Sequence, residues 1–179
     1  MTAQKIHQMQ VAYSQQEDRL LLRFNTSGGV EFRFWLTRLF VKKFWPGLVN
    51  TLDVAVSPNT TNKKKDVVGF MHRAAVEKAD FSSKFEATTA PCPLGDETVL
   101  VCRAAIKANG QGAYVLSLAP EKGKGVELGV DQSLLHMLSK LILDSVANID
   151  WGLSIQIPGV DTKSRFTIEG DNKKGRSLH

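Results

Sequence analysis

The chain has 179 residues, of which 42% are hydrophobic and 23% are charged, a composition typical of a globular protein with one well-buried core. The opening stretch MTAQKIHQMQ lacks the apolar run of a secretory signal, no uncharged apolar run approaches the roughly 18 residues of a membrane span, and two cysteines do not make a disulfide framework. We therefore expect a soluble, cytoplasmic protein.

The net charge of +5 comes from two short basic runs. One run is Lys63 to Lys65, and the other includes Lys173, Lys174 and Arg176. Without these six residues the remainder carries a charge of about −1. Runs of this kind are typical of solvated segments, so the charge does not predict the basic domain surface that nucleic-acid-binding folds present.

The first fifty residues predict three strands and a helix. Alternation of apolar and polar residues predicts strands over 5–14, 18–26 and 29–36. Thr37 is a suitable cap for a helix that begins at Arg38. Pro46 and the glycine after it are expected either to kink this helix or to start a second short one.

Residues 97–148 repeat the same order of elements. Strands are predicted over 97–108, 113–119 and 126–130, and a helix follows, capped by Asp131 or Ser133. At an offset of 96 residues, Thr37 falls on Ser133 and Leu39 falls on Leu135. The repeated order predicts an internal βββα duplication.

The segments between and after these halves are less regular. A polar loop is predicted over 57–66, and a helix over 66–79 with Val67, Phe70, Met71 and Ala74 on its buried face. A long connection over 80–95 is expected to cross from one half to the other. Two further strands are predicted over 151–157 and 164–169.

These elements predict an α+β fold in which helices pack on an antiparallel sheet. We expect a single domain over 1–169, with halves at about 5–55 and 97–150 joined by a loop and helix at 56–96, and a flexible basic tail over 170–179. The helix after Ser133 is apolar nearly all round, which predicts that it lies between the two halves or in a subunit interface.

The residues that carry catalytic chemistry do not form a recognisable site. The four histidines lack ligand spacing; His136 is interpreted as a packed residue and His72 as a surface residue beside Arg73. Cys102 is expected to be a buried inert thiol, and Cys92 to be the more exposed of the two. We therefore expect no enzymatic activity, no metal and no cofactor, with an enzyme whose site forms only on folding as a third alternative.

The stretch EFRFWLTRLFVKKFWP, residues 31–46, carries six of the fourteen aromatic residues and several basic ones. Its apolar positions suit the core, and they are Phe32, Phe34, Leu39, Phe40 and Phe44, with Leu48 one turn further on. The rest could form an aromatic and basic surface suited to single-stranded nucleic acid, and this candidate surface is Arg33, Trp35, Arg38, Lys42 and Trp45. The order of sheet and helix is also similar to that of the Whirly and Pur-type single-strand binders. A membrane-surface role for the same helix is a further alternative.

With this stretch and GKGVELGVDQSLLHMLSKLILDSVANIDW both in view, the chain resembles a family of short hypothetical proteins from proteobacteria. The shared features are an EFRFWLTR segment and a leucine-rich helix that ends in an acid and Trp, and the resemblance covers about Lys5 to Trp151. It implies a bacterial, cytoplasmic origin and assigns no site residue.

Together these observations predict a non-enzymatic binding or assembly module that acts as a homodimer through an apolar or aromatic surface. The alternative is sequence-tolerant binding of single-stranded nucleic acid through the candidate surface.

Overall fold

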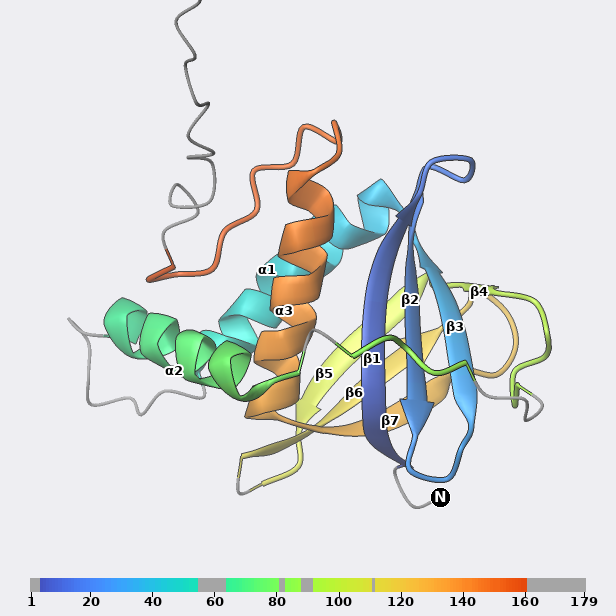
Figure 1. The fold of residues 1–179 in the computed structure, drawn as a ribbon, viewed down its shortest axis with the longest axis horizontal. Coiled ribbons are helices and arrows are strands. Elements are labelled where there is room, and N and C mark those ends of the chain that lie inside the picture. The colour runs from blue at the N-terminus through green and yellow to red at the C-terminus, as the bar shows by residue number, and fades with distance from the viewer. Residues whose placement is uncertain (1–3, 55–63, 81–82, 88–91, 111, 161–179) are drawn as a thin grey trace, which may run out of the picture.

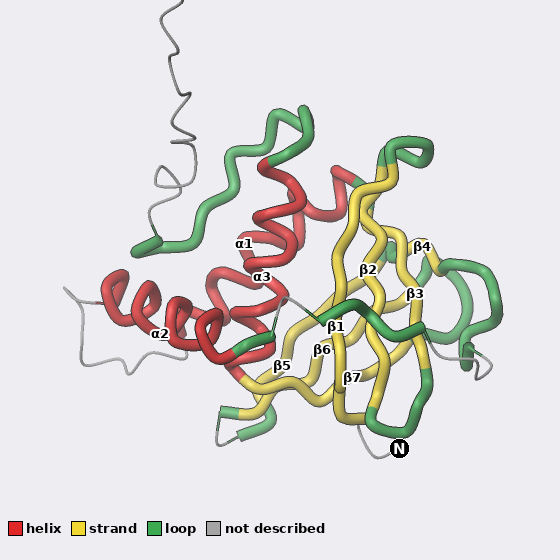
Figure 2. The backbone as a smooth tube through the Cα atoms, viewed as in Figure 1, coloured by secondary structure: helices red, strands yellow, loops and turns green. Residues whose placement is uncertain are grey.

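The structure, a computed structural model, describes residues 4–54, 64–80, 83–87, 92–110 and 112–160, and it confirms the α+β class. Within these residues, seven strands form one curved sheet, and three helices gather on one side of it (Figures 1 and 2). The first half contains β1 (Gln4–Ser14), β2 (Arg19–Thr26), β3 (Glu31–Leu36) and α1 (Arg38–Val54), followed by α2 (Lys64–Lys78). The second half contains β4 (Val99–Leu100), β5 (Arg103–Ala108), β6 (Ala113–Ala119), β7 (Val126–Asp131) and α3 (Gln132–Ala147).

Most neighbouring strands pair antiparallel, as predicted, but two pairs are parallel, so the sheet is mixed. Its strand order is β4-β3-β2-β1-β7-β6-β5, with parallel pairing of β1 to β7 and of β3 to β4. The first and last strands of this order are neighbours in the chain, separated only by Val101 and Cys102. Val101 N donates to Trp35 O at 3.0 Å, and Cys102 N donates to Ala119 O at 3.0 Å. The sheet therefore curls until its two edges meet at residues 99–108.

The strands form because their apolar residues alternate with a period of two. Leu20, Leu22 and Phe24 of β2 are buried in the core, and the ring of Phe24 stacks on Phe32 and Phe34 of β3 at centroid distances of 5.1 and 5.7 Å. The same alternation in the second half buries Leu116, Leu118, Leu128 and Val130. Both halves thus contribute to one core.

The opposite face of the first half is covered by residues 83–87. Asn25 Nδ2 donates to Glu86 O and Glu86 N donates to Gln8 Oε1, each at 3.1 Å. The Arg23 guanidinium lies 4.6 Å from the centroid of the Phe85 ring, within cation–π range. The connection predicted to cross between the halves therefore does so over β1 and β2, as Figure 1 shows.

The helix α3 lies between the two halves, which was one of the two predicted positions. It contacts α1 and β1 of the first half, β7 of the second half, and α2. Asp131 is its N-cap, with its carboxylate accepting from Leu134 N at 2.8 Å. Seven of its residues are buried. Apolar residues all round the helix are needed because it is enclosed on several sides.

The helix α1 runs through Pro46 without a break. The predicted cap is present, with Thr37 Oγ1 accepting from Phe40 N at 3.1 Å. Leu39 was assigned to the core, and that assignment is wrong, because its side chain is 60% exposed. The buried face of α1 instead begins at Val41 and continues through Trp45, Leu48 and Leu52.

The buried face of α2 differs from the predicted one. Its buried residues are Val68, Gly69, His72 and Ala75, whereas Phe70 is 66% exposed. The reason is a close approach of two backbones. A Cβ atom on Gly69 would lie 2.2 Å from the carbonyl oxygen of Gly159, so the face that carries the glycine must meet residues 157–159.

Residues 151–157 were predicted to be a strand, and this is wrong. They form an irregular segment anchored in the core by Trp151 and Ile157. The first half has the order βββα, whereas the strand predicted over 97–108 is divided into β4 and β5, so four strands precede α3 in the second half; the internal duplication stays a prediction. The predicted strand at 164–169, the basic tail and most of the predicted loop at 57–66 lie outside the described residues.

In the part of the chain that the structure describes, none of the helices combines the length and the hydropathy that crossing a lipid bilayer requires.

Candidate functional site

The five residues of the predicted aromatic and basic surface do not lie together. Arg33 and Trp35 are half-buried on the outer face of β3, and Arg33 Nε donates to Glu31 Oε1 at 2.8 Å. This hydrogen bond to a fully buried carboxylate raises the pKa of Arg33 above its ordinary value. Arg38 and Lys42 are exposed on α1. The two groups therefore sit on different elements.

Trp45 does not belong to any surface, which corrects the prediction. Its side chain is 6% exposed, and its Nε1 donates to Gln156 O at 3.1 Å. The spacing placed Trp45 on the same helix face as Arg38 and Lys42, but the ring reaches under the segment that follows α3. A buried indole cannot stack on a nucleobase. Whether the other four residues bind a partner stays a prediction.

Arg38 has an acidic neighbour at the tip of the first hairpin. Asp18 accepts from Trp151 Nε1 at 2.7 Å and from Tyr13 Oη at 2.8 Å. These two hydrogen bonds, together with the charge of Arg38, hold the pKa of Asp18 below its ordinary value. The same contact with Asp18 raises the pKa of Tyr13. This arrangement ties the hairpin to the segment after α3.

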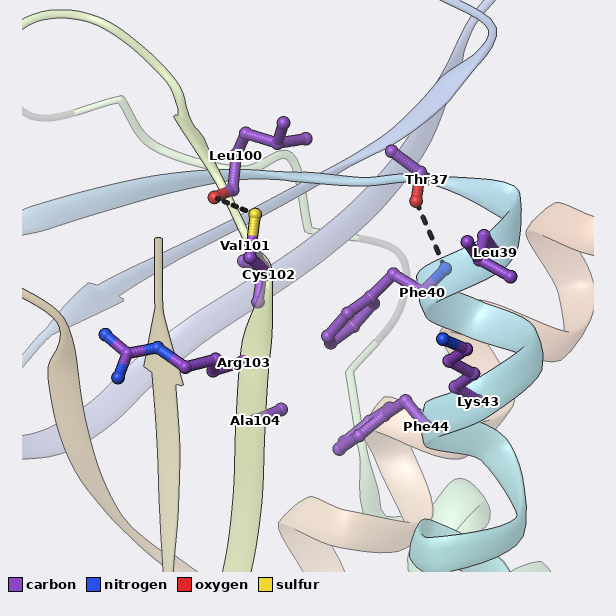
Figure 3. Close-up of a pocket in the computed structure, with 10 residues that line it drawn as sticks. All are labelled: Thr37, Leu39, Phe40, Lys43, Phe44, Leu100, Val101, Cys102, Arg103 and Ala104. Atoms are coloured by element: carbon purple, nitrogen blue, oxygen red, sulfur yellow. Dashed lines mark hydrogen bonds between the residues drawn. The ribbon is translucent and has the colours of Figure 1, made fainter. Parts of the chain in front are cut away.

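A pocket of about 530 Å³ lies between the first turns of α1 and the junction of β4 and β5 (Figure 3). Phe40 and Phe44 project from α1, and their rings stack with centroids 5.4 Å apart and planes 16° apart. Figure 3 shows both rings pointing toward the strand that carries Cys102 and Ala104. The small side chain of Ala104 leaves space opposite the rings. The ten lining residues are Thr37, Leu39, Phe40, Lys43, Phe44, Leu100, Val101, Cys102, Arg103 and Ala104.

The pocket exists because of the way the sheet closes. Thr37 caps α1 immediately after β3, which places the first two turns of the helix beside the end of that strand. On the other wall, the chain passes from its pairing with β3 to its pairing with β6 at Val101 and Cys102. Two segments about sixty residues apart are thereby brought face to face. The contact between α1 and β5 leaves the space between them incompletely filled.

The mouth of the pocket is apolar. Leu39 is 60% exposed and Leu100 is 38% exposed, although both are large hydrophobic residues. Both leucines line the same pocket as the rings of Phe40 and Phe44. Small-ligand sites are typically concave and mostly apolar, with a few polar groups.

The charged lining residues are both basic, and none of the described residues that line the pocket is a carboxylate. Arg103 points away from the two rings in Figure 3, and its Nε and Nη2 both donate to Pro120 O, at 3.2 and 3.1 Å. Lys43 lies between Phe40 and Phe44 along α1. Among the described residues Lys43 makes no ion pair. It is therefore the cation available to a molecule in the pocket.

Both cysteines differ from their predicted exposure. Cys102, expected to be a buried thiol, is exposed and lines the pocket, whereas Cys92 is half-buried. The alternation of β5 fails as a guide here because Cys102 lies in the two-residue junction before that strand. Within the described part of the chain the pocket lining includes no histidine, so it offers the Cys102 thiol no imidazole base.

The two central histidines form a separate cluster between α2 and α3. Their rings meet edge to face with centroids 5.5 Å apart. His136 is packed, as predicted, but the prediction that His72 lies on the surface is wrong, because it is only 5% exposed. Burial, and to a smaller extent the charge of His72, lowers the pKa of His136 to about 4. In the described ranges, no three His, Cys, Asp or Glu residues come together in a group that could hold a metal ion.

The pocket was missed in the sequence because its rings were counted as core. Leu39, Phe40 and Phe44 match the apolar spacing of a helix that packs fully on a sheet.

Compared with known proteins, the chain matches no family model, no curated protein and no solved structure.

Proposed function

We propose that this protein is a non-enzymatic binding module that takes an apolar group into the pocket between α1 and the β4–β5 junction. One observation carries the proposal: exposed Leu39 and Leu100 adjoin the stacked rings of Phe40 and Phe44 at a cavity of about 530 Å³. This volume is within the range of small-ligand sites, which are mostly apolar with a few polar groups at fixed places.

The test uses a neutral fluorescent probe, N-phenyl-1-naphthylamine, whose emission rises in apolar surroundings. We expect it to bind in a ratio near one per chain. Ala104→Leu fills the pocket from the strand and should weaken binding about tenfold or more. Ala105→Leu is the matched control, because adjacent residues of a strand point to opposite faces, so this side chain leaves the pocket open.

The proposal fails if the probe does not bind, or if Ala104→Leu binds it as well as the wild type does. Circular dichroism of both variants checks that the fold is kept.

The homodimer and the binding of single-stranded nucleic acid stay predictions. Burial of Trp45 removes one of the two indoles that the nucleic-acid prediction used. A fluorescent oligonucleotide whose affinity falls steeply with salt and is weakened by Arg38→Ala would favour that prediction. Light scattering distinguishes a dimer from the 19.7 kDa monomer.

A further inference from the structure

We propose that the ligand of this pocket is a single molecule of an amphipathic carboxylate. Its apolar part lies between β5 and the rings of Phe40 and Phe44, and its carboxylate lies at Lys43. This inference rests on the proposed function and adds the chemical class of the ligand.

The first argument is the charge of the pocket. Its ten lining residues include Lys43 and Arg103 and no acid. The first turn of α1 also carries no acid, so nothing on the helix offsets the positive end of its dipole at the same mouth. A cationic head group would meet repulsion here, and a neutral one would gain nothing from the field.

The second argument is the position of Lys43. Phe40 lies one turn before it and Phe44 follows it directly, and all three residues line the pocket. Figure 3 shows the Lys43 side chain on α1 between the points where the two rings leave the helix, and the residue is exposed to solvent. A lysine in this position suits a molecule whose apolar and anionic parts are adjoining. Arg103 contributes to the potential but not to contact, since its guanidinium is held by Pro120 O.

The third argument concerns the source of the ligand. The rings of Phe40 and Phe44 are half-buried and turned toward β5, so the larger part of the apolar surface faces a cavity wall. A helix that inserts into a lipid surface presents its apolar residues outward instead. The geometry therefore favours a single molecule enclosed in the pocket over a lipid surface.

The experiment compares three ligands with the same alkyl chain, decanoate, decan-1-ol and decyltrimethylammonium, each below its aggregation threshold. Displacement of N-phenyl-1-naphthylamine gives the affinities. An independent readout is protection of the Cys102 thiol from N-ethylmaleimide in Cys92→Ser, which leaves Cys102 as the one thiol of the chain.

We expect decanoate to bind about fivefold more tightly than decan-1-ol at low salt, and the ammonium compound to bind more weakly than either. Lys43→Gln should abolish the preference for decanoate over decan-1-ol. Lys42→Gln is the matched control, because Lys42 is also exposed on α1 but does not line the pocket; it should keep the preference.

Equal affinities of decanoate and decan-1-ol in the wild type would overturn the inference while leaving the proposed function in place. Failure of all three ligands and of the neutral probe would overturn both. Sedimentation with phosphatidylglycerol vesicles, without protection of Cys102 by decanoate, would overturn the inference in favour of a lipid surface.

Discussion

The two halves place their helices α1 and α3 in different ways, and Leu39 and Leu135 show the difference. These residues are equivalent at the offset of the predicted duplication, yet Leu39 is 60% exposed and Leu135 is fully buried. The helix α3 is enclosed by α1, α2, β1 and β7, whereas the first turns of α1 face the β4–β5 junction across a pocket. The helix that follows the strands is thus enclosed in the core in the second half, whereas in the first half it lines a pocket.

The strongest test of this difference is the pair Leu135→Ala and Leu39→Ala. We expect Leu135→Ala to lower the free energy of unfolding by about 3 kcal/mol, because it leaves a cavity in a packed interior. Leu39→Ala should change it by less than about 0.5 kcal/mol, because the side chain is already in solvent. Urea unfolding measures both, and similar losses at the two positions would contradict the comparison.

A second test concerns the histidines that close the interior around α3. The folded-state pKa of His136 is about 4, below the ordinary 6.5 that applies to the unfolded chain, so the unfolded chain takes up a proton first as the pH falls. The contribution of neutral His136 to the free energy of unfolding is therefore fully present above pH 6.5 and is lost as the pH falls from 6.5 to 4. This residue should account for about 2 kcal/mol of lost stability at pH 5.

The measurement is urea unfolding at pH 7 and pH 5. His136→Leu should remove that part of the pH dependence, and since neither ring nitrogen of His136 has a hydrogen-bond partner among the described residues, the variant should be no less stable at pH 7. His7→Gln, at an exposed position, is the control and should keep the wild-type dependence. An unchanged pH profile in His136→Leu would refute the assignment.

A third test compares a glycine of α2 with a glycine of α1. Gly69→Ala in α2 should destabilise the fold by about 2 kcal/mol, because its Cβ would lie 2.2 Å from Gly159 O. Gly47→Ala in α1 meets nothing within 4 Å and should stabilise the helix by up to about 1 kcal/mol. Thermal unfolding measures the stability of both variants. If Gly69→Ala leaves the stability unchanged, α2 is not packed against residues 157–159.

The smallest expected effect separates the two tryptophans of the predicted surface. Trp45→Phe removes the hydrogen bond to Gln156 O and should cost about 1 kcal/mol. Trp35→Phe should cost less, because the Trp35 indole is half-buried and donates to no acceptor in the described residues. Equal losses in urea unfolding would show that Trp45 is not the anchor that its burial indicates.

Much of the local structure could be predicted from the sequence. The alternation in β2 and β3 and the caps at Thr37 and Asp131 are short-range signals, and all are present in the structure. The buried face of α2 could not be predicted, because it depends on the contact between Gly69 and Gly159, which lies 90 residues further along the chain. The parallel pairings could not be predicted either, since they join segments from different parts of the chain.

The candidate site shows the same division. Its residues were visible as a run of aromatic and basic side chains, but the partner wall at residues 100–104 lies about sixty positions away. Helical spacing cannot distinguish a ring that packs on a sheet from a ring that faces a cavity. It also placed Trp45 outside, whereas an acceptor at Gln156 O holds the indole within the fold.

By itself, the sequence determined the α+β class, the order of elements in the two halves and the apolar, many-sided character of α3, because periodicity and capping act between near neighbours in the chain. Only the tertiary structure decided that the two edges of the sheet meet at Val101 and Cys102, that Leu39 is exposed while Leu135 is buried, and that Lys43 stands beside an open apolar pocket. The physical reason is that burial depends on which distant segments fill the space around a side chain, and that is a property of the whole fold.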